Sequence, residues 1–589
     1  MLTHLAQAGE FVPPVINWSA LTPLIIIFGA GVLGILLEAF LPDGKRRGPQ
    51  IALALVAQVG AFVALIWVGQ TISESPDPLA ALPVGSALIL DSWTLVVQGV
   101  ILLCSILATL VMVDRTSAKQ DHFAPSAAAI PNSPYEELTR KRGLEQTEVY
   151  PLFLFALGGM LVFPASGDLV TMFIALEVLS LPLYVLTAMA RRRRLLSQEA
   201  SFKYMILGAF ASALFLFGAA LLYGFSGSVT LSGISSAVMG HAQSPTGLES
   251  GVLLLFGIIM VLAGILFKIG AVPFQSWTPD VYQGAPTPIT GFMAACTKIA
   301  AVGLLVRVVI IVVVSSQVDV AEAATKGLWV VAIATMLLGA VVGATQTDMK
   351  RMLGYSSIAH AGFVLVAFLG FSAGTLDAVM IYLLVYGVTT IGAFGIVTLV
   401  REVGPGGEIL GEATHIGQWA GLGKRNPLIA GLFALFLLSF AGIPVTAGFI
   451  AKYHAFSSAL AGEATLLVIM GIISSAVSLF FYIRVIVLMF FVAPAEERIE
   501  TGEQTQAGPN LADPAEDPSP FAANTEPVEL DELTAAARTA VIVPQRSRAV
   551  QVVDSEGPTL AVIFFTGLFV VILGVFPAPI LSLISSLLG

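Results

Sequence analysis

Apolar runs of helix-spanning length constrain this chain more than any other feature of its sequence. A helix needs about 20 apolar residues to cross the hydrocarbon core of a bilayer. Such runs fall near residues 22–40, 50–69, 93–113, 149–165, 168–188, 203–225, 251–272, 286–312, 327–346, 352–370, 375–400, 427–461, 463–492 and 558–585. Charged residues make up only 11% of the 589 residues, against about 25% in a typical soluble protein. The sequence therefore predicts an all-α, polytopic membrane protein of about 14 transmembrane helices.

The distribution of lysine and arginine over the loops predicts the orientation of the chain. The odd-numbered loops hold almost all of these cations, with clusters at 45–47 and 191–194, whereas the even-numbered loops contain only Lys326. Short loops rich in lysine and arginine stay in the cytoplasm. We therefore expect a multi-pass protein of the bacterial plasma (inner) membrane, with both termini on the outer, periplasmic face and the odd-numbered loops in the cytoplasm.

Two loops, 114–148 and 494–557, differ in composition from the rest of the chain. The second holds thirteen acidic residues and four arginines. Low hydrophobicity with high net charge favours disorder. A tolerated insertion explains this loop more simply than a docking segment for a cytoplasmic partner, and it separates the last helix from the others.

The stretch 267–300 sets Lys268 and Lys298 in apolar surroundings on either side of a segment rich in proline and glycine. Proline obstructs a helix interior, so we expect a helix to break just after Lys268 and a new one to start near Pro288. Irregular backbone at membrane depth is tolerated where it lines a wet cavity, which makes a lysine there a candidate ion site. The alternative is that both lysines lie near helix ends and snorkel to water.

A second broken helix is predicted at Gly442 and Pro444, followed by Lys452. Two five-helix blocks that start on opposite sides of the membrane, each with a broken helix, are typical of an inverted repeat. The predicted organisation is an N-terminal three-helix segment (1–113), a cytoplasmic loop (114–148), a first repeat (149–312), a second repeat (327–493), the acidic loop (494–557) and a C-terminal transmembrane helix (558–589).

Several charged residues fall inside predicted spans. Glu177 lies near mid-depth and must face the bundle, with Lys203 on the next helix as a candidate partner. The resulting row of candidate proton-transfer groups is Glu177, Lys203, Lys268, Lys298, His360 and Lys452. A lysine whose carboxylate partner approaches or recedes can bind or release a proton. His360 taken alone is more often a hydrogen-bonded packing residue, and Arg307 and Arg484 are expected to anchor or pair locally.

Three motifs resemble the antiporter-like membrane subunits of respiratory complex I, and most of all the subunit N family. They are FKIGAVPFQSWTPDVYQGAPTPITGFMAACTKIA, TDMKRMLGYSSIAHAGF and FAGIPVTAGFIAKYHAF. The resemblance implies fourteen helices with two inverted five-helix repeats and a proton path. In that path Glu177 and Lys203 match a Glu–Lys pair, Lys268 matches the lysine on the first broken helix, Lys298 matches the connecting central lysine, and Lys452 matches the lysine of the second broken helix. Lysine rather than glutamate at 452 favours subunits N or L, and the lack of a long lateral helix favours N.

The function implied is that of a proton-translocating membrane-arm subunit of NADH:quinone oxidoreductase, a translocase, coupled to quinone reduction elsewhere in the complex. NADH, FMN, iron–sulfur clusters and quinone would be bound by other subunits, because this chain has no Gly-rich strand–helix motif and no cysteine ligand set. Its two cysteines, Cys104 and Cys296, are expected to be small core residues. No metal site and no nucleic-acid partner are expected; the partners are the bilayer and other membrane-arm subunits. The alternatives are a subunit of a multisubunit Na⁺/H⁺ antiporter and a scaffold that carries no protons.

Overall fold

The computed structural model describes most of the chain, in the ranges 16–73, 82–84, 86–115, 121–124, 133–141, 146–243, 247–314, 318–403, 409–493, 550–553, 555 and 557–588. Within these ranges 11 helices are long and apolar enough to cross a membrane, or up to 12 if one bent pair counts as a span. The protein is therefore a polytopic, predominantly helical membrane protein. The acidic loop lies almost wholly outside the described residues, so its disorder stays a prediction.

Eleven of the fourteen apolar runs coincide with these long helices. They are α1 (Trp18–Phe40), α2 (Arg47–Ser73), α3 (Ser92–Val113), α6 (Leu169–Thr187), α7 (Arg194–Ser226), α9 (Gly247–Ile269), the continuous span Thr287–Val313 formed by α11 (Thr287–Phe292), α12 (Lys298–Val308) and two π-helical turns, α13 (Val318–Thr345), α14 (Met349–Phe368), α15 (Thr375–Leu399) and α19 (Thr465–Phe491).

The other three runs form shorter or bent helices, so the expected count of fourteen long helices is met only in part. Run 149–165 is α5 (Val149–Val162) with a 3-10 turn, and run 427–461 is divided into α17 (Pro427–Ala441) and α18 (Ala447–Ala461). The last run bends by 87° between α22 (Thr559–Val575) and α23 (Ala578–Leu588).

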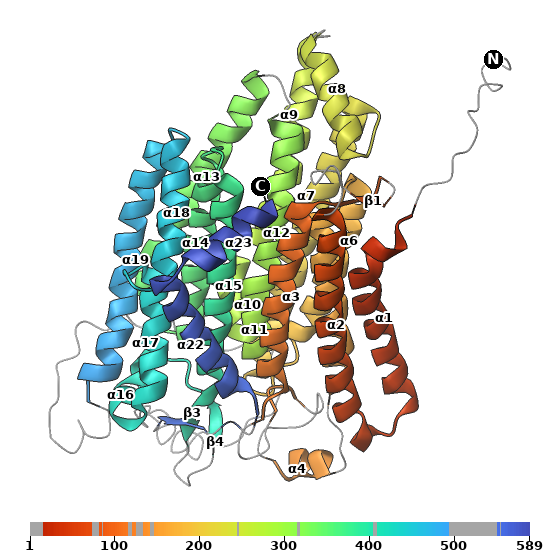
Figure 1. Ribbon diagram of the computed structural model, residues 1–589. Helices are drawn as coiled ribbons and strands as arrows, with labels where there is room; N and C mark the ends of the chain where they lie inside the picture. The colour runs from red at the N-terminus through yellow and green to blue at the C-terminus, as the bar shows by residue number, and fades with distance from the viewer. Residues whose placement is uncertain are drawn as a thin grey trace, which may run out of the picture.

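Burial separates central from peripheral helices. All of the apolar 18-residue stretch of α15 is buried. The buried share of the corresponding stretch is 89% in α14 and in the span Thr287–Val313, but only 33% in α2 and α7. Figure 1 shows α12 and α15 in the middle of the bundle, with α1 and α2 at one side and α19 at the other. Exposed apolar side chains on the peripheral helices suit contact with lipid, because a bilayer removes the cost of leaving them outside a core.

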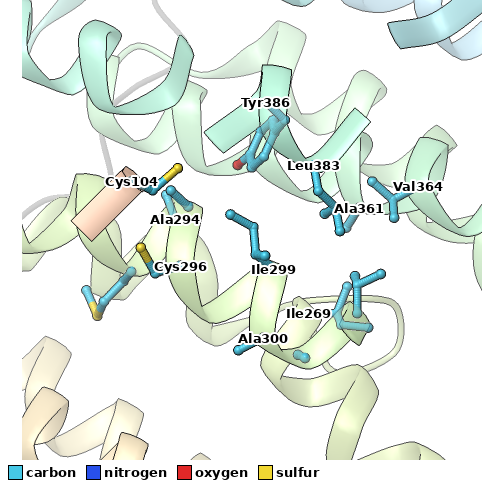
Figure 2. Packing of buried hydrophobic residues seen from close by; sticks show 14 of the residues in the cluster. Cys104, Ile269, Ala294, Cys296, Ile299, Ala300, Ala361, Val364, Leu383 and Tyr386 are labelled. Carbon is cyan, nitrogen blue, oxygen red and sulfur yellow. The ribbon is translucent and has the colours of Figure 1, made fainter. Parts of the chain in front are cut away.

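Both cysteines lie in this central core, as predicted. Cys104 on α3 and Cys296 in the π-helical turn before α12 are unpaired and fully buried. Figure 2 shows them among apolar side chains that include Ala294 and Ile299, close to Tyr386.

Two small sheets were not predicted. Strands β1 (Leu82–Val84) and β2 (Leu88–Leu90) form an antiparallel pair, and β3 (Val400–Val403) lies between β4 (Ile409–Glu412) and β5 (Val550–Val552). Strands of three or four residues are too short to leave a periodic pattern in the sequence. The second sheet joins the chain after α15 to the segment before α22, and Figure 1 places β3 and β4 at the end of the bundle opposite α8 (Leu231–Gln243).

Candidate functional site

Both predicted helix breaks have the same backbone geometry. Gly270 follows α9 with φ 76°, and Gly442 follows α17 with φ 81°. At each break the glycine N–H bonds the carbonyls three and four residues back, and the next N–H bonds the carbonyl five residues back. This is a left-handed helix cap, which favours glycine because a Cβ is disfavoured at positive φ. The predicted break just after Lys268 is therefore confirmed, since α9 ends at Ile269.

The first break is longer than the sequence suggested. Between it and the helix that begins at Thr287 the structure has a further helix, α10 (Trp277–Gly284). Its eight residues contain Pro279 in the first turn, where a proline is tolerated because that N–H lacks an intrahelical partner anyway. Proline and glycine at this density predicted only irregular chain, so α10 went unrecognised.

Lys268 lies in the last turn of α9 with 2% of its surface exposed. Its Nζ has no hydrogen-bond partner in the described part of the chain and sits 5.1 Å from the ring centre of Tyr204 and 5.6 Å from that of Tyr184. Aromatic faces attract a cation by their quadrupole. Lys268 is thus held in an aromatic cage inside the protein and does not snorkel to water.

Glu177 and Lys203 do not form the expected pair. Lys203 is half-exposed and bonds Glu199 at 2.6 Å and Asp280 at 2.9 Å. Among the described residues no ion pair joins Lys203 to Glu177. The sequence placed Lys203 shallower than Glu177 but could not say which cation Glu177 faces.

Lys298 occupies the middle of its span, with 3% of its surface exposed. It follows a π-helical turn (η4, Met293–Thr297), a distortion that is frequent at functional sites. Its Nζ donates to the carbonyl of Ser357 at 2.6 Å. The Ser357 hydroxyl in turn accepts from the hydroxyl of Tyr386 at 2.8 Å.

His360 is buried on α14, three residues after Ser357, and is bonded through both ring nitrogens. Nδ1 lies 2.8 Å from the hydroxyl of Tyr382, and Nε2 lies 3.4 Å from that of Tyr482. Tyr482 also hydrogen-bonds Ser356, the neighbour of Ser357. Each of these groups can donate or accept, so the cluster forms a continuous set of exchangeable protons. The tyrosines come from α15 and α19 and were not singled out from the sequence.

Lys452 on α18 reaches back to the C-terminal end of α17. Its Nζ donates to the carbonyl of Ala441 at 2.8 Å and to the hydroxyl of Ser475 at 2.7 Å, and 5% of its surface is exposed. The end of a helix carries partial negative charge, which stabilises a cation there. A Cβ on Gly442 would lie 2.7 Å from Lys452 Cδ, so this glycine also makes room for the lysine.

A second cluster of buried charges lies beside the strands β3 and β4. Glu412 accepts from the Thr287 hydroxyl and lies 3.7 Å from Lys350 and 3.9 Å from Arg401. Burial raises the pKa of the Glu412 carboxyl, but these two cations outweigh burial and hold the pKa below its usual value. Burial and the charge of Arg401 lower the pKa of His122 to about 4. Lys350 precedes the predicted span 352–370 and was therefore counted among the cations of an odd-numbered loop, but it is only 2% exposed.

The arrangement suits proton transfer. Lys298 bonds the carbonyl of Ser357, and the adjacent Ser356 belongs to the hydrogen-bonded cluster of His360. Lys268 and Lys452 each lie at a helix break. Among the described residues no group of three histidine, cysteine or acidic side chains could hold a metal ion. Arg307 pairs with Asp91 at 2.8 Å and Arg484 bonds two carbonyls at the end of α13, so both pair locally, as expected.

Comparisons with known proteins agree with one another. Residues 166–478 match the family described as the transmembrane region of NADH:quinone oxidoreductase and Mrp antiporters. NADH-quinone oxidoreductase subunit N of Beutenbergia cavernae is 53% identical over 79% of this chain and 87% of its own. The corresponding protein of Rhodococcus opacus is 49% identical over 84% and 91%.

Solved structures share the fold. A chain of respiratory complex I from Thermus thermophilus superposes with a TM-score of 0.65 at 26% identity, covering 95% of this chain and 98% of that one. A chain of the Mrp complex from a Dietzia species gives a TM-score of 0.68 at 20% identity, covering 97% of each. The second likeness is informative about fold alone.

Proposed function

Because this chain belongs to the NADH-quinone oxidoreductase subunit N family of antiporter-like membrane subunits, we propose that it moves protons along Glu177, Lys203, Lys268, Lys298, His360 and Lys452. The observation that carries the proposal is the burial of three lysines, Lys268, Lys298 and Lys452, which are 2%, 3% and 5% exposed. A charged group inside the membrane is costly to place there, and such groups mark ion pathways.

The central step runs from Lys298 to His360. Lys298 is bonded to the backbone of Ser357, and the adjacent Ser356 is bonded to Tyr482, which reaches His360. A hydroxyl can accept a proton on one lone pair while donating its own. The hydroxyls of Ser356 and Tyr482 thus give a short relay to His360, and its Ser356 end is next in the chain to the residue whose carbonyl holds Lys298.

The outer steps use the two breaks. Beside Lys268, the hydroxyl of Thr278 and the Nζ of Lys298 both lie within 4 Å of where a Cβ on Gly270 would be. Buried hydroxyls such as Thr278, unpartnered within the described protein, are commonly bonded by water. At the second break Ser475 and the end of α17 stabilise the charged form of Lys452. Lys203, half-exposed, serves to bring protons to or from this first block.

The proposed topology is that of fourteen crossings in the bacterial plasma membrane, with both termini outside. In this topology α5, the α17–α18 pair and α22 cross as well as the long helices. Residues 149–312 and 327–493 form two inverted repeats, an arrangement supported by the matching caps at Gly270 and Gly442. Other membrane-arm subunits of complex I are the partners, and NADH, FMN, iron–sulfur clusters and quinone are held by other subunits.

An Na⁺/H⁺ antiporter subunit is the less favoured function. This chain is 20% identical in sequence to the Mrp chain but 53% identical to subunit N of Beutenbergia cavernae. A scaffold without proton transfer is disfavoured by the buried lysines, since a passive element gains nothing from charge in hydrocarbon.

The test is Lys298→Ala in the assembled complex, with Lys326→Ala as the control. In the described part of the chain Lys326 is paired with Glu322 at the surface, and its side chain is 74% exposed. NADH-driven proton uptake into membrane vesicles, normalised to complex content, is expected to fall at least about tenfold for Lys298→Ala, the effect of removing a positioned proton carrier. Normal uptake in this variant would refute the proposal.

A further inference from the structure

The short helix α10 contacts the surroundings of two buried lysines. At one end, Trp277 stacks on Tyr204 with ring centres 4.7 Å apart and planes 10° apart. Tyr204 is part of the aromatic cage of Lys268. The Trp277 indole N–H also donates to the carbonyl of Phe267 at 2.8 Å. The position of α10 therefore determines how the cage of Lys268 is closed.

Further along the same helix, Tyr282 approaches the site of Lys298. Its hydroxyl lies 3.4 Å from the hydroxyl of Ser357, whose carbonyl holds Lys298 Nζ. Trp277 and Tyr282 are five residues apart on one helix, so they move together. Both lysine sites consequently respond to a displacement of α10.

Close packing holds α10 between two long helices. A Cβ on Gly284 would lie 2.4 Å from the Cβ of Ala200 on α7, and one on Gly354 of α14 would lie 3.2 Å from the Cα of Pro279. A side chain at 284 would therefore clash with α7, and one at 354 would push against Pro279 by a few tenths of an ångström. Close packing of this kind leaves no room for a larger side chain at either glycine.

Asp280 connects α10 to both of these neighbours. One carboxylate oxygen accepts from Lys203 Nζ of α7 at 2.9 Å, and the other accepts from Arg351 Nη1 of α14 at 2.5 Å. Arg351 also bonds Gln283 of α10 at 3.2 Å. The carboxylate is therefore shared between a cation of the first block and a cation of the helix that carries His360.

We propose that Asp280 is a positioning residue whose two ion pairs hold α10 in register, so that α10 couples the site of Lys268 to that of Lys298. This rests on the proposed function, since coupling of the two sites matters only in a chain that moves protons. Coupling requires an element with two arrangements that both sites bias. Trp277 and Tyr282 give α10 a contact with each of the two sites, and Asp280 fixes the position of α10 between α7 and α14.

The test uses Asp280→Asn in the assembled complex, with Asp280→Glu as the conservative variant. Asparagine keeps the size and removes the charge, whereas glutamate restores it. Per assembled complex, Asp280→Asn is expected to lower NADH-driven proton uptake by about fivefold or more, the lower range of coupling effects between sites, and Asp280→Glu is expected to recover most of it. Glu322→Gln, which removes a carboxylate from a surface pair on α13, is the matched control and is expected to leave uptake unchanged.

Arg351→Gln extends the test, because it leaves the pair of Asp280 with Lys203 intact and removes the bonds of Arg351 to Asp280 and Gln283. It is expected to give a smaller loss than Asp280→Asn. The double variant is expected to lose less than the two single losses combined, since the two side chains share one ion pair. If Asp280→Asn does not assemble, Arg351→Gln carries the test by itself. Unchanged uptake per complex in the variants that assemble, or strictly additive losses, would overturn the inference.

Lys298→Ala measured in parallel separates this inference from the proposed function. Normal uptake in Lys298→Ala means that the proposed function fails. Loss of uptake in Lys298→Ala together with normal uptake in Asp280→Asn means that only the role of Asp280 fails.

Discussion

Replacing Gly442 by alanine tests whether the second break positions Lys452. Gly442 has φ 81°, and a Cβ there would lie 2.7 Å from Lys452 Cδ, 3.3 Å from Cε and 3.4 Å from Nζ. Alanine therefore meets two costs at once, a left-handed backbone and a clash with the lysine stem. The clash is relieved only if Lys452 moves away from the carbonyl of Ala441.

The magnitude follows from these two costs. A left-handed conformation costs a residue with a Cβ about 1–2 kcal/mol. Loss of one hydrogen bond to the charged amine costs about 1.5–3 kcal/mol, which corresponds to about a 10- to 150-fold shift of Lys452 away from its position. The thermal stability of the complex and its proton uptake should both fall, the latter by about tenfold if Lys452 acts from this position.

Gly431→Ala provides the matched control. Gly431 lies in α17, the same broken helix, and a Cβ there would meet nothing within 4 Å. Alanine favours a helix over glycine by about 1 kcal/mol, so this variant should be neutral or slightly more stable. The assay is proton uptake in vesicles and the thermal midpoint of the purified complex. Equal behaviour of Gly442→Ala and Gly431→Ala would refute the argument that the break positions Lys452.

Two further predictions concern the hydroxyl relay to His360 and the charge cluster of Glu412 beside β3 and β4. Tyr482→Phe removes the hydroxyl shared by Ser356 and His360 and is expected to lower proton uptake several-fold, whereas Tyr223→Phe on the exposed face of α7 should not; equal uptake in the two variants would exclude this hydroxyl from the relay. The pKa of Glu412 is lowered despite burial, because Lys350 and Arg401 act on it. Its contribution to the stability of the folded protein is therefore full above the usual pKa of 4.5 and is lost as the pH falls through the pKa in the folded state. The difference in thermal midpoint between the wild type and Glu412→Gln should therefore narrow below about pH 4.5, and a constant difference would contradict the assignment.

Local signals in the sequence predicted the features that depend on composition and backbone alone. Apolar length located the spans, and proline and glycine located both breaks, because bilayer thickness and the missing donor of proline act on a few neighbouring residues. The same reasoning found Lys268, Lys298 and Lys452, since a lysine far from the end of an apolar run is recognisable wherever its partners lie. The short strands and α10 escaped because three to eight residues are too few to establish a period.

Tertiary structure decided which groups meet. Lys203 bonds Asp280, and Lys350 is buried beside Glu412, neither of which follows from the order of residues. The physical reason is that pairing between membrane helices depends on their rotation and relative depth, and these are fixed by packing among segments far apart in the chain. The sequence by itself determined that buried charges exist at two broken helices; only the packing of α10 between α7 and α14 decided how those charges are connected.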